Sequence, residues 1–303
     1  MAGSEENADA YGDFAEVYDT LMDTAPYEAW CGRVVEFIEK YGISRPKRRQ
    51  ARADGEAVLG LGQLNEEAAL ASERDLVVDL GCGTGTLTQL LAEKGYDMIG
   101  VDNSPEMLGK AMEKKARSGA DILYLEQDMR ELELYGNVGT VVSVCDSLNY
   151  LLEEEELLRV FRLVNNYLYP GGIFVFDFNT EYKYETVIGD ATIAENREEC
   201  GFIWENTYDA ETGRNEYDLT VFVREADGRF RRFTETHFQR GYTAERMKSF
   251  VEAAGMRVVE LMDADTHDRV RPESERVYLV AKEYRKESKG SVRIPLTEAG
   301  EKS

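Results

Sequence analysis

The stretch VVDLGCGTG, which runs from Val77 to Gly85, decides the fold of this chain. It passes from an apolar, β-branched run into a turn with glycine at positions 81, 83 and 85. Glycine permits positive φ angles and lets backbone N–H groups approach a ligand closely, and the N-terminus of a following helix favours an anion. The stretch therefore predicts a strand, a ligand-binding turn and a helix, the order found at the first crossover of an open α/β sheet.

The chain after this turn alternates short apolar strands with helices. Runs such as DMIGVD, DILYLE, VGTVVSVC and GIFVFDF are largely apolar, and helical stretches such as Pro105–Arg117 and Glu153–Leu168 separate them. Strands of this kind, connected by helices, form a parallel sheet that is covered on both faces. The last two apolar runs, MRVVELM and RVYLVAK, have no helix between them, so we expect them to pair antiparallel at the end of the sheet.

The spacing of apolar residues along the sequence changes after the fifth expected strand. FIWENTYD, NEYDLTVFV and RFRRFTETHFQR alternate in side-chain character, and glycine-containing turns at Glu211–Gly213 and Ala226–Gly228 join them. This pattern predicts an inserted antiparallel sheet. The expected fold class is therefore α/β, with a doubly wound, Rossmann-like, mostly parallel seven-stranded sheet and an inserted antiparallel β-sheet after strand five.

Composition and charge limit the classes of function. The 36 basic and 59 acidic residues give a formal net charge of −23, a field that repels a polyanion and disfavours nucleic acid as a partner. Four widely spaced cysteines and two histidines make no recognisable metal set, so we expect no metal. No apolar run approaches the roughly 18 residues of a membrane-spanning helix. The acidic N-terminal stretch lacks secretory-signal features, so we expect a cytoplasmic protein without a membrane partner.

Acidic side chains follow the next two strands. The dinucleotide fingerprint G-x-G-x-x-G needs glycine three residues after Gly83, where Thr86 stands, so a pyrophosphate cradle is the weaker interpretation. Asp102 ends the next strand, where a carboxylate can accept from both ribose hydroxyls; capping the following helix is its alternative role. Asp128 follows the strand DILYLE, where its carboxylate could accept a hydrogen bond from the exocyclic amine of a base while Met129 packs on that base. Three strand ends together indicate an adenosine site.

As a set, these motifs resemble those of class I S-adenosylmethionine-dependent methyltransferases of the small-molecule type. The resemblance covers the chain from about Asp75 to Lys282. It rests on D-x-G-x-G-x-G at residues 79–85, the acid at 102, the Asp-Met pair at 128–129, VVSVCDSLNYL at 141–151 and LYPGGIFVFDFNT at 168–180. The resemblance implies that S-adenosyl-L-methionine is the cofactor.

The resemblance also implies roles by position. Asp79 and the backbone around Gly81 and Gly83 would face the methionine part of the cofactor. Asp102, with Asn103 beside it, would hold the ribose.

The remaining positions in the motifs would surround the adenine and the sulfonium. Asp128 and Met129 would lie around the adenine, and Cys145 and Asp146 would lie under the sulfonium at the end of the fourth strand. Cys145, like Cys82, could instead be a small buried hydrophobe.

The N-terminal stretch YGDFAEVYDTLM resembles a Y-x-x-F-A-x-x-Y-D segment of the same group. There, Tyr11 and Tyr18 would close over the cofactor as a lid; ordinary helix packing is the alternative. We expect His237 and Tyr18 to position the substrate, although His237 could also be a half-exposed strand histidine. No dedicated base is required, because holding the acceptor near the methyl carbon of a sulfonium can supply most of the acceleration.

The expected organisation has five parts. They are an N-terminal helical lid at 1–43 that contains a helix at Tyr27–Tyr41, a flexible insertion at 44–74, the S-adenosylmethionine-binding methyltransferase domain at 75–180 and 241–283, the inserted sheet at 181–240, and a mobile tail at 284–303. The insertion opens with a basic cluster, and a docking arm for an acidic partner is its alternative role.

The favoured methyl acceptor is a small molecule. The segment Cys145–Tyr150 follows the fourth strand, where DNA amino-methyltransferases carry a Pro-Pro-Tyr-like tetrad, and the chain contains no Pro-Pro or Pro-Cys pair. RNA or a protein side chain ranks behind. Two other classes remain open, a non-catalytic module that binds S-adenosylmethionine and a nicotinamide-dependent oxidoreductase. We expect a monomer or a homodimer.

Overall fold

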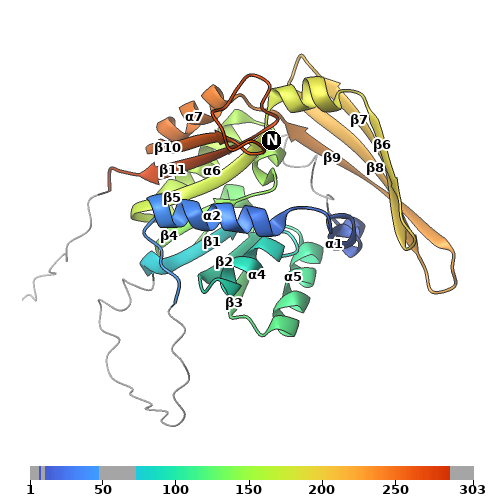
Figure 1. The fold of residues 1–303 in the computed structure, drawn as a ribbon, viewed down its shortest axis with the longest axis horizontal. Coiled ribbons are helices and arrows are strands. Elements are labelled where there is room, and N and C mark those ends of the chain that lie inside the picture. Colours follow the sequence, from blue (N-terminus) through green and yellow to red (C-terminus); the bar gives the residue numbers. More distant parts are fainter. Residues whose placement is uncertain (1–6, 8–10, 48–72, 287–303) are drawn as a thin grey trace, which may run out of the picture.

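The computed structural model describes residue 7 and residues 11–47 and 73–286. Most of the expected insertion and the tail beyond residue 286 lie outside this part of the chain. The described residues form a seven-stranded central sheet and a separate four-stranded sheet that projects from it (Figure 1).

The central sheet has the strand order β3-β2-β1-β4-β5-β11-β10. β1 to β5 pair in parallel, and β11 pairs antiparallel with both β5 and β10. The strands are β1 (Leu76–Leu80), β2 (Asp97–Asp102), β3 (Ile122–Glu126), β4 (Val138–Ser143), β5 (Leu168–Asn179), β10 (Met256–Asp263) and β11 (Arg276–Glu283). This confirms the expected mostly parallel sheet and the antiparallel pairing of its last two strands. The order reverses between β1 and β4, where such sheets bind ligands.

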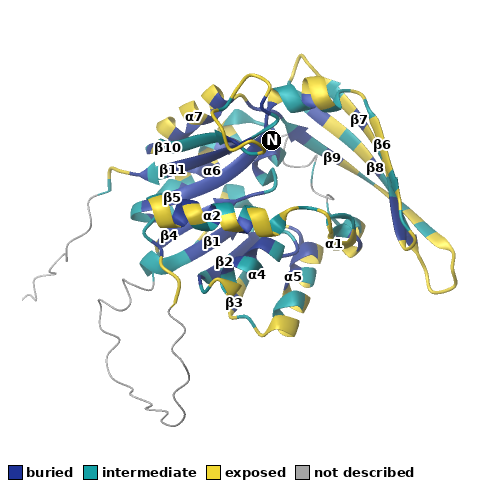
Figure 2. Ribbon diagram, viewed as in Figure 1, coloured by how far each residue is buried: buried dark blue, intermediate teal, exposed yellow. Residues whose placement is uncertain are grey.

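Helices cover both faces of this sheet. One apolar cluster joins the strands to α6 and α7, and a second joins them to α2 and α4. The inner strands β1, β4, β5 and β11 are largely buried, which explains their continuous apolar sequences, whereas β3 and β10 are partly exposed (Figure 2). The long helices are α2 (Tyr27–Tyr41), α4 (Thr86–Glu93), α5 (Pro105–Ser118), α6 (Glu154–Tyr167) and α7 (Ala244–Ala253).

The inserted sheet has four antiparallel strands in the order β6-β7-β8-β9. They are β6 (Thr192–Asn196), β7 (Cys200–Asp209), β8 (Arg214–Arg224) and β9 (Phe230–Arg240). Sequence patterning predicted the last three and missed β6, a short and largely exposed strand. The sheet lies between β5 and α7 in the chain, as expected, and extends as a long blade beyond the central sheet (Figure 1).

The N-terminal segment lies between the two sheets (Figure 1). It contains η1 (Asp13–Glu16) and α1 (Tyr18–Leu21). Val17 packs in an apolar cluster with residues of β7 and β8. On the other side, the carboxylate of Asp19 accepts a 2.7 Å hydrogen bond from the Thr84 hydroxyl and pairs with the Lys114 ammonium. Residues 11–22, called the lid segment below, therefore connect the inserted sheet to the helix side of the glycine turn.

Candidate active site

A pocket opens beyond the carboxyl ends of β1, β2, β3 and β4. All the residues expected to bind the cofactor line it: Tyr11, Tyr18, Asp79, Gly81, Gly83, Asp102, Asn103, Asp128, Met129 and Cys145. Sequence reasoning missed several other lining residues, which include Tyr27, Trp30, Arg130, Ser147 and Tyr150. His237 is fully buried and is not among the lining residues.

The three glycines of the turn have different reasons to be glycine. Their φ angles are 76° at Gly81, 53° at Gly83 and 74° at Gly85, a region that favours glycine. A Cβ on Gly81 would lie 2.7 Å from the Cβ of Ser147, and one on Gly85 would lie 2.9 Å from the Cβ of Ala111. A Cβ on Gly83 would meet nothing within 4 Å, so Gly83 presents its backbone to the open pocket.

Asp102 ties the glycine turn to the end of β2. Its Oδ2 accepts from the Gly83 N–H at 2.7 Å, and its Oδ1 accepts from the Ser104 N–H at 2.9 Å. Burial raises the pKa of Asp102, and these backbone hydrogen bonds offset part of that rise. The N-cap of α5 is Ser104, whose hydroxyl accepts from the Met107 N–H, so the alternative role of Asp102 as the cap is wrong.

Asp79 is 2% exposed near the end of β1. Its Oδ2 accepts a 2.6 Å hydrogen bond from the Thr88 hydroxyl. Burial raises the pKa of Asp79 to about 7, and the Thr88 hydrogen bond offsets only part of the effect. A buried carboxyl group with one hydrogen bond can accept more, and a cation would favour its ionised form.

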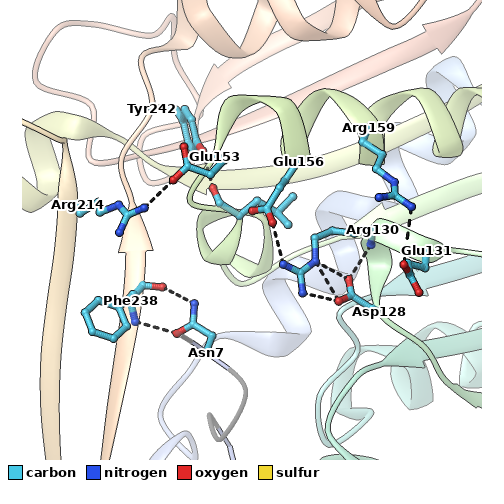
Figure 3. A network of polar contacts seen from close by, with 11 residues as sticks. Asn7, Asp128, Arg130, Glu131, Glu153, Glu156, Arg159, Arg214, Phe238 and Tyr242 are labelled. Carbon is cyan, nitrogen blue, oxygen red and sulfur yellow. Dashed lines mark hydrogen bonds and ion pairs between the residues drawn. The ribbon is translucent and has the colours of Figure 1, made fainter. Parts of the chain in front are cut away.

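Arg130 holds the carboxylate of Asp128 (Figure 3). Its Nε lies 2.9 Å from both carboxylate oxygens, and its Nη1 donates to Glu156 at 2.8 Å. Burial raises the pKa of Asp128, but the hydrogen bonds and charge of Arg130 outweigh it and leave the pKa below its usual range. Arg130 thus fixes the orientation of an acid that the sequence had identified, although the sequence did not reveal the partner.

The loop after β4 has an unusual backbone. Cys145 and Asp146 have φ angles of 71° and 52°, and Asp177 accepts from their N–H groups at 3.1 and 2.8 Å. Asp146 does not line the pocket; its carboxylate accepts from the Gln239 amide. Burial raises the pKa of Cys145 to about 12, which favours a protonated thiol at neutral pH.

Tyrosines form the wall between the pocket and His237. The hydroxyl groups of Tyr11 and Tyr150 lie 2.6 Å apart, and those of Tyr150 and Tyr217 also lie 2.6 Å apart. His237 Nδ1 lies 3.2 Å from the Tyr150 hydroxyl, so the histidine reaches the pocket through Tyr150. The alternative for His237, a half-exposed strand histidine, is therefore wrong, because the residue is fully buried.

The chemistry of the pocket lining fits S-adenosylmethionine. The open side of Gly83 leaves room for a ligand, and the buried acid Asp79 suits an ammonium group. Aromatic rings such as Trp30 and Tyr27 suit a sulfonium, because ring faces attract cations. Among the described residues, no group of three or more His, Cys, Asp or Glu side chains is placed to hold a metal. A doubly wound sheet with this pocket defines a class of α/β proteins that bind nucleoside cofactors.

Comparisons with known proteins agree with this class. A family model described as "Methyltransferase domain" matches residues 77–172. Two relatives, each named "putative methyltransferase", come from Geobacillus sp. (strain WCH70) and Bacillus subtilis (strain 168). The first is 34% identical over 90% of this chain and 99% of its own length, and the second is 32% identical over 89% of this chain and 96% of its own length.

A solved structure shares the fold over the same span. An S-adenosylmethionine-dependent methyltransferase from Clostridium acetobutylicum ATCC 824 has a TM-score of 0.73 and 26% identity, and the match covers 90% of this chain and 99% of that one. The chain therefore belongs to the class I S-adenosylmethionine-dependent methyltransferases. S-adenosyl-L-methionine is its methyl donor. In the described part of the chain, no helix is long and apolar enough to cross a bilayer.

Proposed function

We propose that this methyltransferase acts on a small-molecule acceptor. The main support for this proposal is the charge of the side chains that line the pocket. Arg130 is the one cationic side chain among its described lining residues, and Asp128 and Glu156 already pair with it. A site that binds RNA needs basic side chains that are available to contact the phosphates, and the net charge of −23 opposes the approach of a polyanion.

The proposed roles of the lining residues follow from their places. Asp79 and the backbone at Gly83 hold the methionine part, and Asp102 and Asn103 hold the ribose. The adenine lies near Asp128 and Met129, beyond the end of β3, and Cys145 lies below the sulfonium. The lid segment, with Tyr11 and Tyr18, closes over these groups.

When bound, S-adenosylmethionine supplies a methyl group on a good leaving group. The protein contributes by excluding water and by holding the acceptor atom in line with the methyl carbon. Tyr18 and Tyr150 line the pocket together with Cys145, and their position there supports a role in holding the acceptor. One relative supports the proposal. It matches about a third of this chain and is named a glycine/sarcosine N-methyltransferase, from Halorhodospira halochloris, so its named acceptors are small molecules.

A panel of acceptors tests the proposal. The purified chain is incubated with methyl-labelled S-adenosylmethionine and, in separate reactions, with amines, alcohols, phenols, carboxylic acids, total RNA and denatured cell protein. We expect one chemical class of small molecule to take up label. Label that enters only RNA or only protein would show that the acceptor is a macromolecule.

A further inference from the structure

Five polar groups meet behind the acceptor side of the pocket. The Tyr150 hydroxyl lies 2.6 Å from those of Tyr11 and Tyr217 and 3.2 Å from His237 Nδ1. On the far side of the ring, His237 Nε2 lies 3.4 Å from Glu235 Oε2. Tyr11 and Tyr150 line the pocket, whereas the side chain of His237 is 1% exposed. A continuous path therefore leads from the pocket to a buried carboxylate.

The neighbours of His237 define which of its nitrogens carries the proton. Nε2 is buried and has no hydrogen bond of good geometry to the described residues, and the Glu235 oxygen beside it presents only lone pairs. A lone pair on Nε2 would face another lone pair, so the proton belongs on Nε2. Nδ1 is then an acceptor, directed at the Tyr150 hydroxyl.

The Tyr150 hydroxyl fits this arrangement. It has one proton and can accept two hydrogen bonds. Donation to His237 Nδ1 leaves its oxygen to accept from Tyr11 and Tyr217, whose hydroxyls lie at equal distances. The ring of His237 stacks on Tyr217 with centroids 4.9 Å apart at 8°, which fixes the imidazole plane.

We propose that a relay of hydroxyl groups, Tyr11 and Tyr150, with His237 and Glu235 behind them, carries away the proton of the methyl acceptor, a step that rests on the proposed function. As the acceptor atom bonds to the methyl carbon and the carbon–sulfur bond breaks, the acceptor proton passes to the Tyr11 oxygen, and the Tyr11 proton passes to the Tyr150 oxygen. The Tyr150 proton passes to His237 Nδ1 in the same step. The resulting imidazolium, with protons on both nitrogens, forms an ion pair with Glu235 through Nε2. The acceptor is accordingly a group that bears a proton when it binds.

Glu235 also links this path to closure of the lid segment. Its Oε2 accepts from the Tyr11 N–H at 2.9 Å, and its Oε1 accepts from the Phe14 N–H at 2.8 Å. Burial raises the pKa of Glu235, but the contact with His237 and these two N–H donors outweigh it, so the pKa lies below its usual range. Glu235 is therefore a carboxylate that the docked lid segment holds next to His237. Removal of the lid segment would leave it free to turn away.

Nuclear magnetic resonance of the imidazole nitrogens tests the assignment without an acceptor. The chain has two histidines, and His267→Asn leaves His237 as the one imidazole signal. In protein labelled with ¹⁵N at histidine, we expect a neutral ring with the proton on Nε2 at pH 7.5, and we expect Tyr150→Phe to shift the Nδ1 resonance. A ring with its proton on Nδ1, or an imidazolium at that pH, would overturn the proposal, because Nδ1 could then accept nothing.

Kinetics with the acceptor found in the panel give the second test. We expect Tyr150→Phe and His237→Gln each to lower kcat by roughly a hundredfold, while calorimetry finds the Kd for S-adenosylhomocysteine within about twofold of wild type. Tyr135→Phe, at a fully exposed tyrosine, is the matched control and should leave both values unchanged. Full kcat in either Tyr150→Phe or His237→Gln would refute the proton path. Failure of the wild-type chain to methylate any small molecule would instead refute the proposed function.

Discussion

Asp79 and Asp102, at the ends of adjacent strands, differ in how their carboxyl groups are used. Asp102 accepts from two backbone N–H groups and so shapes the glycine turn. Asp79 accepts only the hydroxyl of Thr88 among the described residues and is 2% exposed, so it keeps capacity for a cationic ligand. We therefore propose that Asp79 keeps its remaining hydrogen-bonding capacity for the ammonium group of the cofactor, whereas Asp102 shapes the glycine turn in addition to holding the ribose.

The raised pKa of Asp79 predicts a dependence of stability on pH. The folded carboxyl group has a pKa of about 7, above the ordinary value of 3.8 for an aspartic acid, so between these values the folded chain holds a proton that the unfolded chain has lost. Stability contributed by the neutral group is present below pH 4 and is lost as the pH rises to 7, with a limit of about 4 kcal/mol. We expect Asp79→Asn to become more stable relative to wild type across this range in urea unfolding. A constant difference between the two proteins would contradict the raised pKa.

The glycine turn offers a matched pair of substitutions. Alanine at either position takes an unfavourable positive φ, which costs about 1–2 kcal/mol. Gly81→Ala adds a collision with Ser147, whereas Gly83→Ala meets open space. We therefore expect Gly81→Ala to lower the free energy of unfolding by more than Gly83→Ala, and Gly83→Ala to weaken S-adenosylhomocysteine binding despite its smaller effect on folding. Equal losses of stability would contradict the packing described at Gly81.

The sequence identified the acids and glycines of the pocket but not the side chains that hold them. The strand-end positions of Asp102 and Asp128 follow from hydrophobic periodicity, which is local along the chain. Arg130 stands only two positions after Asp128, but it also contacts Glu156, 26 positions further on, and the partner of His237 is a tyrosine 87 positions away. Contacts of this kind depend on how strands and helices pack, so no spacing in the sequence predicts them.

Among the secondary-structure elements, those of the lid segment have a proposed role in cofactor binding that can be tested directly. Tyr18 lines the pocket and packs edge-on against Tyr11 and Phe14, with centroids 5.9 and 5.6 Å away. We expect Tyr18→Ala to raise the Kd for S-adenosylmethionine about tenfold, since an aromatic contact with a cation is worth about 1 kcal/mol or more. The melting temperature should change little. Tyr135→Ala is the control, because that side chain is fully exposed; an unchanged Kd in Tyr18→Ala would refute a lid role.

Sequence periodicity predicted the buried elements better than the exposed ones. The helix at Tyr27–Tyr41 has the expected bounds, because its apolar residues recur at helical spacing and pack against the sheet. β6 escaped prediction because its residues, Thr192–Asn196, are mostly exposed and it is defined by backbone pairing with β7. A strand that is stabilised mainly by backbone pairing need not alternate polar and apolar side chains, so the sequence pattern does not reveal it.

For the molecule as a whole, the lid segment joins two separate sheets. Asn7 and Phe238 exchange two hydrogen bonds between the N-terminal region and β9, at 3.0 and 2.9 Å (Figure 3). The carboxylate of Glu235 on the same strand accepts from the lid segment. A ligand that contacts the lid segment should therefore also slow the opening of β9.

Hydrogen exchange checks this coupling. We expect S-adenosylhomocysteine to slow amide exchange in the glycine turn, in the lid segment and in β9, because the lid segment contacts both the glycine turn and β9. Exchange in the outer turn at 225–229, which lies at the far end of the inserted sheet, should not change and provides an internal control. Protection confined to the glycine turn would mean that the inserted sheet is independent of cofactor binding.

The central claim is that this chain moves the methyl group of S-adenosylmethionine to a small molecule. The most direct measurement follows S-adenosylhomocysteine release and labelled methyl transfer together, in a cell extract separated into small molecules, RNA and protein. We predict one labelled small-molecule product for each S-adenosylhomocysteine released. Release of S-adenosylhomocysteine with the label in RNA or protein, or with no label among the small molecules, would contradict the claim.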